Sequence, residues 1–377
     1  MVPEDPVAWV ALSLLHGLGP LQVRRALREF GSARDVAFRI PPVCLAAALG
    51  LSQGRADLIT SGRRSLEQLA EREVREAEHL GIRLIAPPDP SYPSAFEQLP
   101  DSPILLYVKG SLDPGVVRIA IVGSRRATAY GRRVATGLAS GLSLRGVEIV
   151  SGGARGIDTC AHLGALEAGG RTIAVMGSGF RSIYPAENAT LFDRIAANGA
   201  VITEFRLDME PKGENFPRRN RLIAGLAAAV VVVEAAERSG SLSTAAHALE
   251  QGREVMAVPG PVSSDQSVGC HRLIQQGAKL VQKVDDVLDE LSPMYASALR
   301  PAGPPLVDEA DRSPVAMAPD ETAVLALLDD PEPVHLDVLA DRAPFGIARL
   351  QAAIFGLELR GAVEQLPGQY YLARFRK

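Results

Sequence analysis

Five short apolar runs alternate with stretches of helical pattern, and this alternation constrains the fold of the 377-residue chain more than any other feature. Strands separated by helices of this length pair in parallel, and right-handed crossovers bring the loop after every strand to one edge of the sheet. The sequence therefore predicts an α/β fold with a Rossmann-like parallel sheet at its core. The predicted strands are Ile119–Val122, Val147–Val150, Ile173–Met176, Ala200–Thr203 and Ala229–Glu234.

The loops that follow these runs are rich in glycine, hydroxyl groups and arginine. Because the topology gathers them at one edge, we expect them to line a common crevice. Glycines allow close approach of the backbone, and amide-rich helix starts and guanidinium groups attract phosphate. The crevice is therefore predicted to bind phosphate groups, through the loops Gly123–Thr128, Ser151–Asp158, Gly177–Gly179 and Arg238–Ser241.

Composition limits the protein class without specifying it. A hydrophobic content of 47% and a mean hydropathy of +0.08 supply enough material for a buried core and exclude wholesale disorder. The net charge of −4 is not that of a general nucleic-acid binder. Local clusters of positive charge nevertheless occur, at Arg125, Arg126, Arg132 and Arg133, and at Lys212, Arg218, Arg219 and Arg221.

The three cysteines, Cys44, Cys160 and Cys270, are isolated and lack CxxC spacing. Neither a disulfide framework nor a thiolate metal site is indicated, and a reducing cytoplasm is the expected compartment. No apolar run approaches the ~20 residues that a membrane-spanning helix needs. We expect a cytoplasmic protein without a membrane partner.

Four regions are expected along the chain: a helical domain at 1–81, the Rossmann-like domain at 82–292, a linker at 293–318 and a winged-helix domain at 319–377. The first region shows helical patterns at Trp9–His16, Leu21–Phe30, Val43–Leu51 and Ala56–Leu80. Its turn Gly17–Pro20 has the form of a helix-hairpin-helix turn that offers amides to DNA phosphate. A turn within a small helical bundle is the interpretation that we favour.

Residues 82–93 have the composition of an extended, proline-rich connector, and Pro103–Val108 of a strand leading into the core. The region 319–377 combines three short helical patterns with a hairpin around Pro367-Gly368, which is typical of a winged helix. Its last helix carries only Arg349 and Arg360 as bases. A protein-contact role is therefore at least as consistent with this module as reading of duplex DNA.

The sequence lacks a complete motif for dinucleotide binding and any motif for nucleotide hydrolysis. Gly177–Ser182 approaches GxGxxG but lacks the final glycine, and no acidic residue follows at the spacing that grips ribose. No GxxxxGK[ST] occurs, so the lysine that would hold a terminal phosphate is missing. Asp158, Glu204 and Glu234 follow strands and have acid–base potential, but such carboxylates more often cap helices or hold arginines.

Single-stranded nucleic acid fits the residues better. The segment Phe216–Arg221 adds three guanidinium groups and an aromatic ring just before an expected helix at Leu222–Leu226. A positive track combined with aromatic platforms holds single strands. Phe216 is also compatible with an ordinary core position. Since Arg218, Arg219 and Arg221 cannot all face one way on a helix, we expect one or two at the ligand and the rest paired with Glu204, Glu214 or Glu234.

Four strings, in this order, closely resemble the bacterial DNA-processing protein DprA (Smf) family: Ile121–Arg126, Ser151–Asp158, Phe216–Arg221 and Val258–Gly260. The resemblance is specific over about 82–291 and looser at both ends, which resemble the sterile-alpha-motif-like domain of some members and the winged helix. It implies a homodimer, formed through the Rossmann-like domain, that binds single-stranded DNA during natural transformation. It also implies loading of the RecA recombinase in place of single-strand-binding protein, a further expected partner, and no enzymatic activity.

The resemblance also implies the DNA-binding residues. They are Gly123, Ser124, Arg125, Arg126 and Thr128; Gly152, Gly153, Arg155 and Gly156; Phe216, Arg218, Arg219, Asn220 and Arg221; and Ser239, Gly240 and Ser241. The local cluster of positive charge adds Lys212 to the expected DNA-binding residues. We assign no catalytic residue, no metal ligand and no cofactor. One departure from the family pattern is Gly269-Cys270-His271, where an asparagine usually stands in the place of His271.

Two alternatives remain open at this point. A nucleotide-processing enzyme of the phosphoribohydrolase kind uses a related fold, but its Pro-Gly-Gly-x-Gly-Thr loop is broken here at Val258–Pro261. A protein-interaction scaffold without nucleic-acid binding is the other alternative.

Overall fold

The computed structural model describes residues 5–291, 299, 318–328, 332–359 and 362–373. The chain divides into two compact units, residues 1–303 and 304–377. Apart from Leu299 and Ala318, the linker expected at 293–318 lies outside the described residues.

The described part of the first unit contains a nine-stranded sheet in the order β1-β2-β6-β5-β4-β3-β7-β8-β9. Strands β3 to β9 are parallel, as expected, and the central ones are buried on both faces, which explains their near-continuous apolar sequences. The strands are β1 Arg83–Ile85, β2 Leu106–Gly110, β3 Arg118–Val122, β4 Glu148–Ser151, β5 Thr172–Val175, β6 Ala200–Thr203, β7 Ala229–Val232, β8 Glu254–Ala257 and β9 Lys279–Leu280.

One edge of the sheet departs from the parallel arrangement. Strand β2 pairs antiparallel with β6, and β1 pairs antiparallel with β2. The sequence predicted a strand near β2 but only a connector at β1, because the three-residue strand Arg83–Ile85 is too short to show a period.

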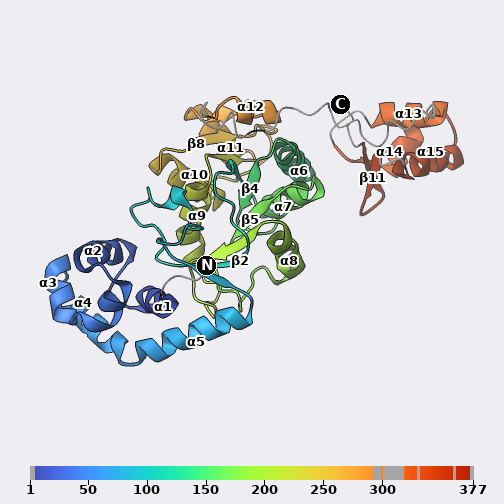
Figure 1. Cartoon of the computed structure of the whole chain (residues 1–377). Helices are drawn as coiled ribbons and strands as arrows, with labels where there is room; N and C mark the ends of the chain where they lie inside the picture. Colours follow the sequence, from blue (N-terminus) through green and yellow to red (C-terminus); the bar gives the residue numbers. More distant parts are fainter. Residues whose placement is uncertain (1–4, 292–298, 300–317, 329–331, 360–361, 374–377) are drawn as a thin grey trace. The chain divides into compact units, whose positions relative to one another are not determined.

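Helices cover both faces of the sheet (Figure 1). Side chains of β3 and β7 alternate between two buried clusters, one shared with α9, α10 and α11 and the other with α6, α7 and α12, while α8 packs on β5 and β6 on the second face. This alternation follows from the two-residue period of a strand. The helices are α6 Ala129–Leu144, α7 Ile157–Glu167, α8 Ala189–Asn198, α9 Asn215–Leu226, α10 Ser241–Glu250, α11 Val268–Gln275 and α12 Val284–Leu288.

The amino-terminal region is helical, as expected, but its long pattern at Ala56–Leu80 divides into two helices around a 3₁₀ turn at Arg63–Ser65. Gly17, with φ of +95°, packs against α4: a Cβ there would lie 3.0 Å from the Arg55 carbonyl oxygen. The Gly17–Pro20 turn thus belongs to the packing of the bundle. The helices are α1 Pro6–Leu14, α2 Pro20–Phe30, α3 Pro42–Leu49, α4 Gln53–Gly62 and α5 Leu66–His79, with a π-helical turn at Asp35–Arg39.

These helices share a buried cluster with the sheet region. Val74 of α5 belongs to the same cluster as Leu105 and Tyr107, which lie immediately before and within β2. Polar contacts reinforce the packing: Arg24 Nη1 donates to the Leu99 carbonyl at 2.7 Å.

The second unit is a winged helix. Helices α13 Pro319–Leu327, α14 Leu336–Arg342 and α15 Ile347–Leu359 pack with a small sheet of β10 Val334–His335, β12 Tyr370–Ala373 and β11 Val363–Leu366, in that order. Arg349 of α15 is paired with Asp320, at 2.5 Å between Nη2 and Oδ1. Arg360 lies outside the described residues.

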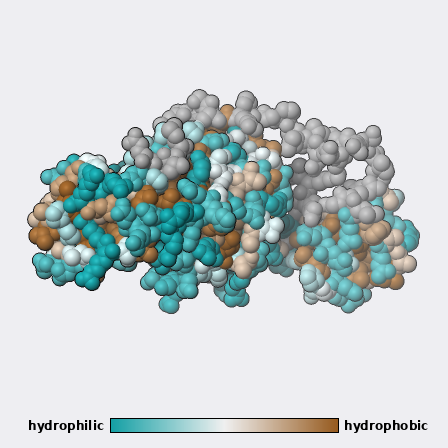
Figure 2. Space-filling view, turned by 60° about the horizontal axis from the view of Figure 1, so that its bottom comes forward, coloured by the Kyte–Doolittle hydropathy of each residue, from teal (hydrophilic) through white to brown (hydrophobic). Residues whose placement is uncertain are grey.

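Figure 2 shows one face of the molecule, on which hydrophobic residues form separate patches among hydrophilic ones. Within the described part of the chain, none of the helices combines the length and the apolar character required to span a bilayer.

Candidate nucleic-acid interface

The crevice expected from the sequence lies where the strand order reverses. Strand β3 has β4 on one side and β7 on the other. Successive strands are therefore added in opposite directions on the two sides of β3, and open α/β sheets bind ligands at such a switch point. A cavity of about 590 Å³ opens at the carboxyl ends of these strands. We call it the switch-point crevice; its lining includes Gly123, Ser124, Arg125, Arg126, Asp158, Phe216, Pro217, Arg219, Asn220, Ser239, Gly240, Ser241, Ser243, Thr244 and Gln266.

Helix α9 corrects one expectation. The helix predicted at Leu222–Leu226 begins at Asn215, so the whole segment Phe216–Arg221 is helical. Pro217 did not prevent this, because the first turn of a helix does not need its backbone N–H groups for internal hydrogen bonds. Helical spacing then sends the side chains of this segment to different sides.

Two cations stand at the rim of the crevice without a carboxylate partner. Arg125 and Arg126 are exposed, and neither lies within ion-pair distance of an acidic residue among those described. The Cζ atom of Arg125 lies 5.0 Å from the centre of the Phe216 ring, a cation–π distance. Of these two arginines, Arg125 therefore meets an aromatic ring in the cavity, and Arg126 lines the same cavity.

Phe216 is half-buried and is held from two further sides. A Cβ on Gly177 would lie 2.7 Å from the ring, so this glycine permits the close packing. The Tyr184 ring lies 5.7 Å away, centre to centre, and is 39% exposed. The aromatic position is thus fixed in place while part of it remains accessible.

Arg219 has a different role from the rim arginines. It is 4% exposed, and its Nη1 donates to the carbonyl oxygens of Gly152, at 2.5 Å, and Val175. Burial lowers the pKa of Arg219 to about 10, although Asp158 opposes the shift. Arg219 therefore ties the loop after β4 and the end of β5 to α9, and its Nη1 and Nε donors already have partners.

Asp158 is the buried counterpart of Arg219. Its Oδ2 accepts a hydrogen bond from the Ala154 amide at 3.2 Å, at the start of α7. Burial raises the pKa of Asp158, and Arg219 is the largest influence that lowers it again. This carboxylate holds the loop at the start of α7, and it lies near enough to Arg219 for the two charges to influence each other.

The amide cradle at the start of α6 is occupied by the protein itself. The Thr128 amide donates to Glu234 Oε2 at 2.9 Å, and its hydroxyl donates to Oε1 at 2.6 Å. Gly131 allows the approach, since a Cβ there would lie 2.3 Å from the Glu234 carboxyl carbon. A carboxylate thus fills the position where Rossmann folds bind pyrophosphate, and Thr128 does not line the crevice.

Several other expected residues also lie outside the lining of the crevice. Arg155 is exposed and forms an ion pair with Glu187, with 3.1 Å between Nη2 and Oε2. Lys212 is exposed in the loop before α9. The glycines Gly152, Gly153 and Gly156 shape the loop after β4, and at each of them a Cβ would come within 2.6 Å of another residue.

Arg218 and Arg221 leave the crevice altogether. They project from the other side of α9, where Glu204 binds both: Arg221 Nη2 lies 2.5 Å from Oε2 and Arg218 Nε lies 3.3 Å from Oε1. Burial raises the pKa of Glu204, while Arg221 lowers it. The expectation that some of the three arginines pair with an acidic residue is met by Glu204.

Gln266 was missed in the sequence. It lies in the loop between β8 and α11, and its Oε1 accepts a hydrogen bond from the Ser124 hydroxyl at 2.6 Å. The rule that loops after strands converge would have found it, had the strand at β8 been included. His271 contacts the same loop through Nε2, 2.9 Å from the Gly260 carbonyl oxygen.

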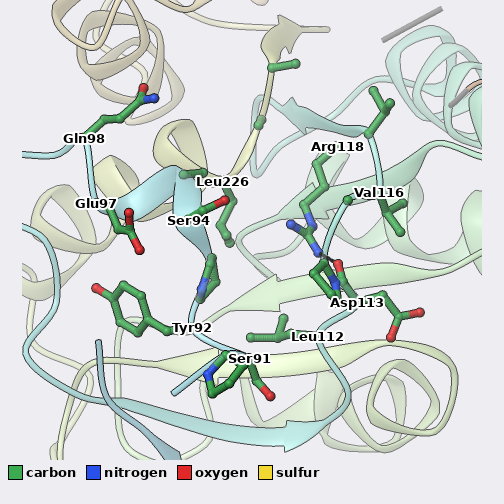
Figure 3. A pocket seen from close by; sticks show the side chains of 18 of the residues that line it. Ser91, Tyr92, Ser94, Glu97, Gln98, Leu112, Asp113, Val116, Arg118 and Leu226 are labelled. Atoms are coloured by element: carbon green, nitrogen blue, oxygen red, sulfur yellow. Dashed lines mark hydrogen bonds between the residues drawn. The ribbon is translucent and has the colours of Figure 1, made fainter. Parts of the chain in front are cut away.

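A second cavity, of about 490 Å³, lies at the opposite edge of the sheet, where β3, β7 and β8 begin. Figure 3 shows Arg118 reaching toward Asp113 at one wall of this cavity. Arg118 Nε donates to Glu148 Oε2 at 2.7 Å, and Nη2 donates to the Asp113 carbonyl at 2.5 Å. The buried guanidinium group of Arg118 is therefore already paired within the protein.

Among the described residues, no cluster of three or more histidine, cysteine or acidic side chains has the arrangement of a metal site.

Two family models match the chain. Residues 83–292 match the model described as DNA recombination-mediator protein A, and residues 308–369 match the DprA winged helix domain. The first match contains every residue that lines the switch-point crevice.

Curated relatives and a solved structure agree with these models. Protein Smf of Synechocystis sp. is 32% identical over 99% of this chain and 100% of its own length, and Protein Smf of Escherichia coli is 42% identical over 75% of each. The crystal structure of DNA processing protein A from Streptococcus pneumoniae superimposes with a TM-score of 0.67 at 34% identity, covering 78% of this chain and 99% of that one.

Proposed function

Because the chain belongs to the DNA recombination-mediator protein A (DprA, Smf) family, we propose that it binds single-stranded DNA in the switch-point crevice and mediates recombination. The observation that carries the proposal is the pair of unpaired cations, Arg125 and Arg126, beside the accessible ring of Phe216. The two arginines can bind phosphates of a single strand, and the Phe216 ring can stack on its unpaired bases.

Within this proposal the residues have distinct roles. Arg125 and Arg126 contact phosphates, Phe216 or the Arg125 guanidinium stacks on a base, and Ser239 and Ser241 donate hydrogen bonds from the far wall. Arg219 and Asp158 position the loops. Lys212 and Arg155 lie outside the cavity and act on the strand beyond it, while Arg218 and Arg221 support α9 from behind.

The wider role follows from the family. The protein receives incoming DNA in natural transformation, displaces single-strand-binding protein and loads RecA. It acts in the cytoplasm as a homodimer joined through the Rossmann-like domain, within the four-region organisation expected from the sequence. It makes and breaks no bond: of the carboxylates near the crevice, Asp158 accepts the Ala154 amide, and Glu234 accepts the amide and hydroxyl of Thr128 at the start of α6.

Titration of a labelled oligo-dT at several salt concentrations tests DNA binding. Each phosphate neutralised on a single strand adds about 0.7 to the slope of log K against log salt, so binding should weaken steeply as salt rises. A flat dependence would contradict the proposal. Incubation with nucleoside monophosphates tests the non-catalytic part, which released base or sugar phosphate would overturn.

RecA loading needs its own measurement. RecA should begin to hydrolyse ATP sooner on oligo-dT coated with single-strand-binding protein when this protein is added. An unchanged lag, with DNA binding intact, would remove RecA loading from the proposal and leave the crevice in place.

A further inference from the structure

A cavity larger than the switch-point crevice lies on the other side of α9. It measures about 1090 Å³ and is formed by the turn after α1, helices α4 and α5, the loop after β6 and α9. We call it the α5–α9 cleft. All these elements belong to one compact unit; all but α9 share a buried cluster, and Arg221 of α9 is joined to Glu204 in the loop after β6.

The carboxylates in the lining of the α5–α9 cleft are already neutralised or hydrogen-bonded. Arg221 binds two of them, with 3.0 Å to Asp101 Oδ2 and 2.5 Å to Glu204 Oε2. The other two have partners of their own: the Leu207 amide donates to Glu73 at 2.7 Å, and Arg206 pairs with Asp208 at 2.8 Å.

Two cations of the lining have no such partner. Arg55 on α4 and Arg72 on α5 are exposed, and neither lies within ion-pair distance of an acidic residue among those described. In addition, Nη1 of the buried Arg221 has no hydrogen-bond partner within the described part of the chain. The charge left available in the cleft is therefore positive, and it suits an anionic occupant.

The apolar part of the lining is aliphatic. Leu58 is 51% exposed and Leu69 is 39% exposed, and Leu66 and Leu105 of the same lining are buried. The lining contains two aromatic rings: His16 is exposed, whereas Phe205 is 3% exposed and covered by Arg218 at 5.1 Å. A base entering the cleft would find one open ring, the imidazole of His16, whereas leucine-lined grooves accept aliphatic peptide side chains.

We propose that the α5–α9 cleft docks an acidic peptide segment with apolar side chains, supplied by a partner protein. Its carboxylates pair with Arg55 and Arg72, and its apolar side chains cover Leu58 and Leu69. This site is separate from the switch-point crevice, since α9 presents Arg219 and Asn220 to the crevice and Arg218 and Arg221 to the cleft.

Selection from a random dodecapeptide library on the full-length protein tests this proposal. Peptides that bind should combine aspartate or glutamate with leucine, isoleucine or phenylalanine. Their affinity, measured by fluorescence anisotropy, should fall at least tenfold with R55E/R72E, and should fall as salt rises. The exposed pair R28E/R75E on α2 and α5 carries the same change of charge outside the cleft, and should leave the affinity unchanged.

The outcomes separate this proposal from the one on DNA. If selection yields no peptide, or peptides that bind equally to R55E/R72E, the docking site is refuted. If R55E/R72E instead weakens oligo-dT more than R28E/R75E does, the cleft binds nucleic acid and the proposed occupant is wrong. Oligo-dT binding that fails in every variant, the unmodified chain included, refutes the DNA proposal alone.

Discussion

The two sides of α9 use the same short sequence for opposite purposes. Toward the switch-point crevice, Phe216 meets the unpaired Arg125, and Arg219 is buried among carbonyl groups. Toward the α5–α9 cleft, Arg218 and Arg221 are bound by Glu204. An arginine-rich string therefore does not define one positive surface, because helical geometry divides it and each guanidinium acts according to the partners it finds.

Among the tests of this difference between the two sides of α9, the largest effect is expected when Arg221 is replaced by methionine. Arg221 and Glu204 are 7% and 4% exposed as side chains, so loss of the arginine leaves a buried carboxylate without its main partner. We expect the free energy of unfolding to fall by about 3–5 kcal/mol. Urea denaturation followed by circular dichroism measures it.

Arg218→Met is the matched control for this change. The Arg218 side chain is 55% exposed, so its removal should cost about 0–1 kcal/mol. If the free energy of unfolding fell equally in the two variants, burial of the ion pair with Glu204 would not make Arg221 more important for stability than Arg218.

Replacement of Phe216 by leucine tests the aromatic role on the crevice side. Loss of stacking should weaken oligo-dT binding by about 1–3 kcal/mol per stacked base, without changing the salt slope, because no charge is removed. Phe216→Tyr should retain most of the affinity. A leucine variant that binds as tightly as the original would make Phe216 a packing residue against Gly177 only.

Replacement of Arg125 by alanine tests the electrostatic role. We expect about a tenfold loss of oligo-dT affinity, equivalent to about 1.4 kcal/mol. The salt slope should become shallower by about 0.7, in contrast to the leucine variant at Phe216. Arg194→Ala removes an exposed charge from α8 and should change neither quantity; equal effects of the two alanines would mean that net charge, not position, governs binding.

The smallest effect is expected at Arg155, which Glu187 already neutralises. Arg155→Ala should lower oligo-dT affinity only about twofold, and Glu187→Gln should raise it by a similar factor, since exposed ion pairs contribute little. The same titrations at low salt measure both. A loss at Arg155 as large as that at Arg125 would place Arg155 on the main path of the strand.

Much of the core could be predicted from the sequence. Apolar runs such as Ala229–Val232 are buried parallel strands, and the loops after them do meet at one edge, because strand burial and crossover handedness are general properties of the chain. The antiparallel edge could not be predicted, since the direction in which β1 and β2 add to the sheet depends on where β6 leaves a free edge.

The sequence could not distinguish arginines that are free from arginines that are already bound. Arg125, Arg155, Arg219 and Arg221 look alike in the sequence, yet their partners are an aromatic ring, Glu187, two carbonyl groups and Glu204. Those partners lie up to 91 residues away along the chain, as Phe216 does from Arg125. Only folding brings them into contact.

The sequence by itself determined the βα repetition, the glycine and arginine loops and the convergence of those loops, because these depend on local periodicity and on the handedness of the backbone. The tertiary structure alone decided which charges remain available, namely Arg125 and Arg126 at the crevice and Arg55 and Arg72 at the α5–α9 cleft. The availability of a charge depends on desolvation and on neighbours within a few ångströms, and residues distant in the chain supply both.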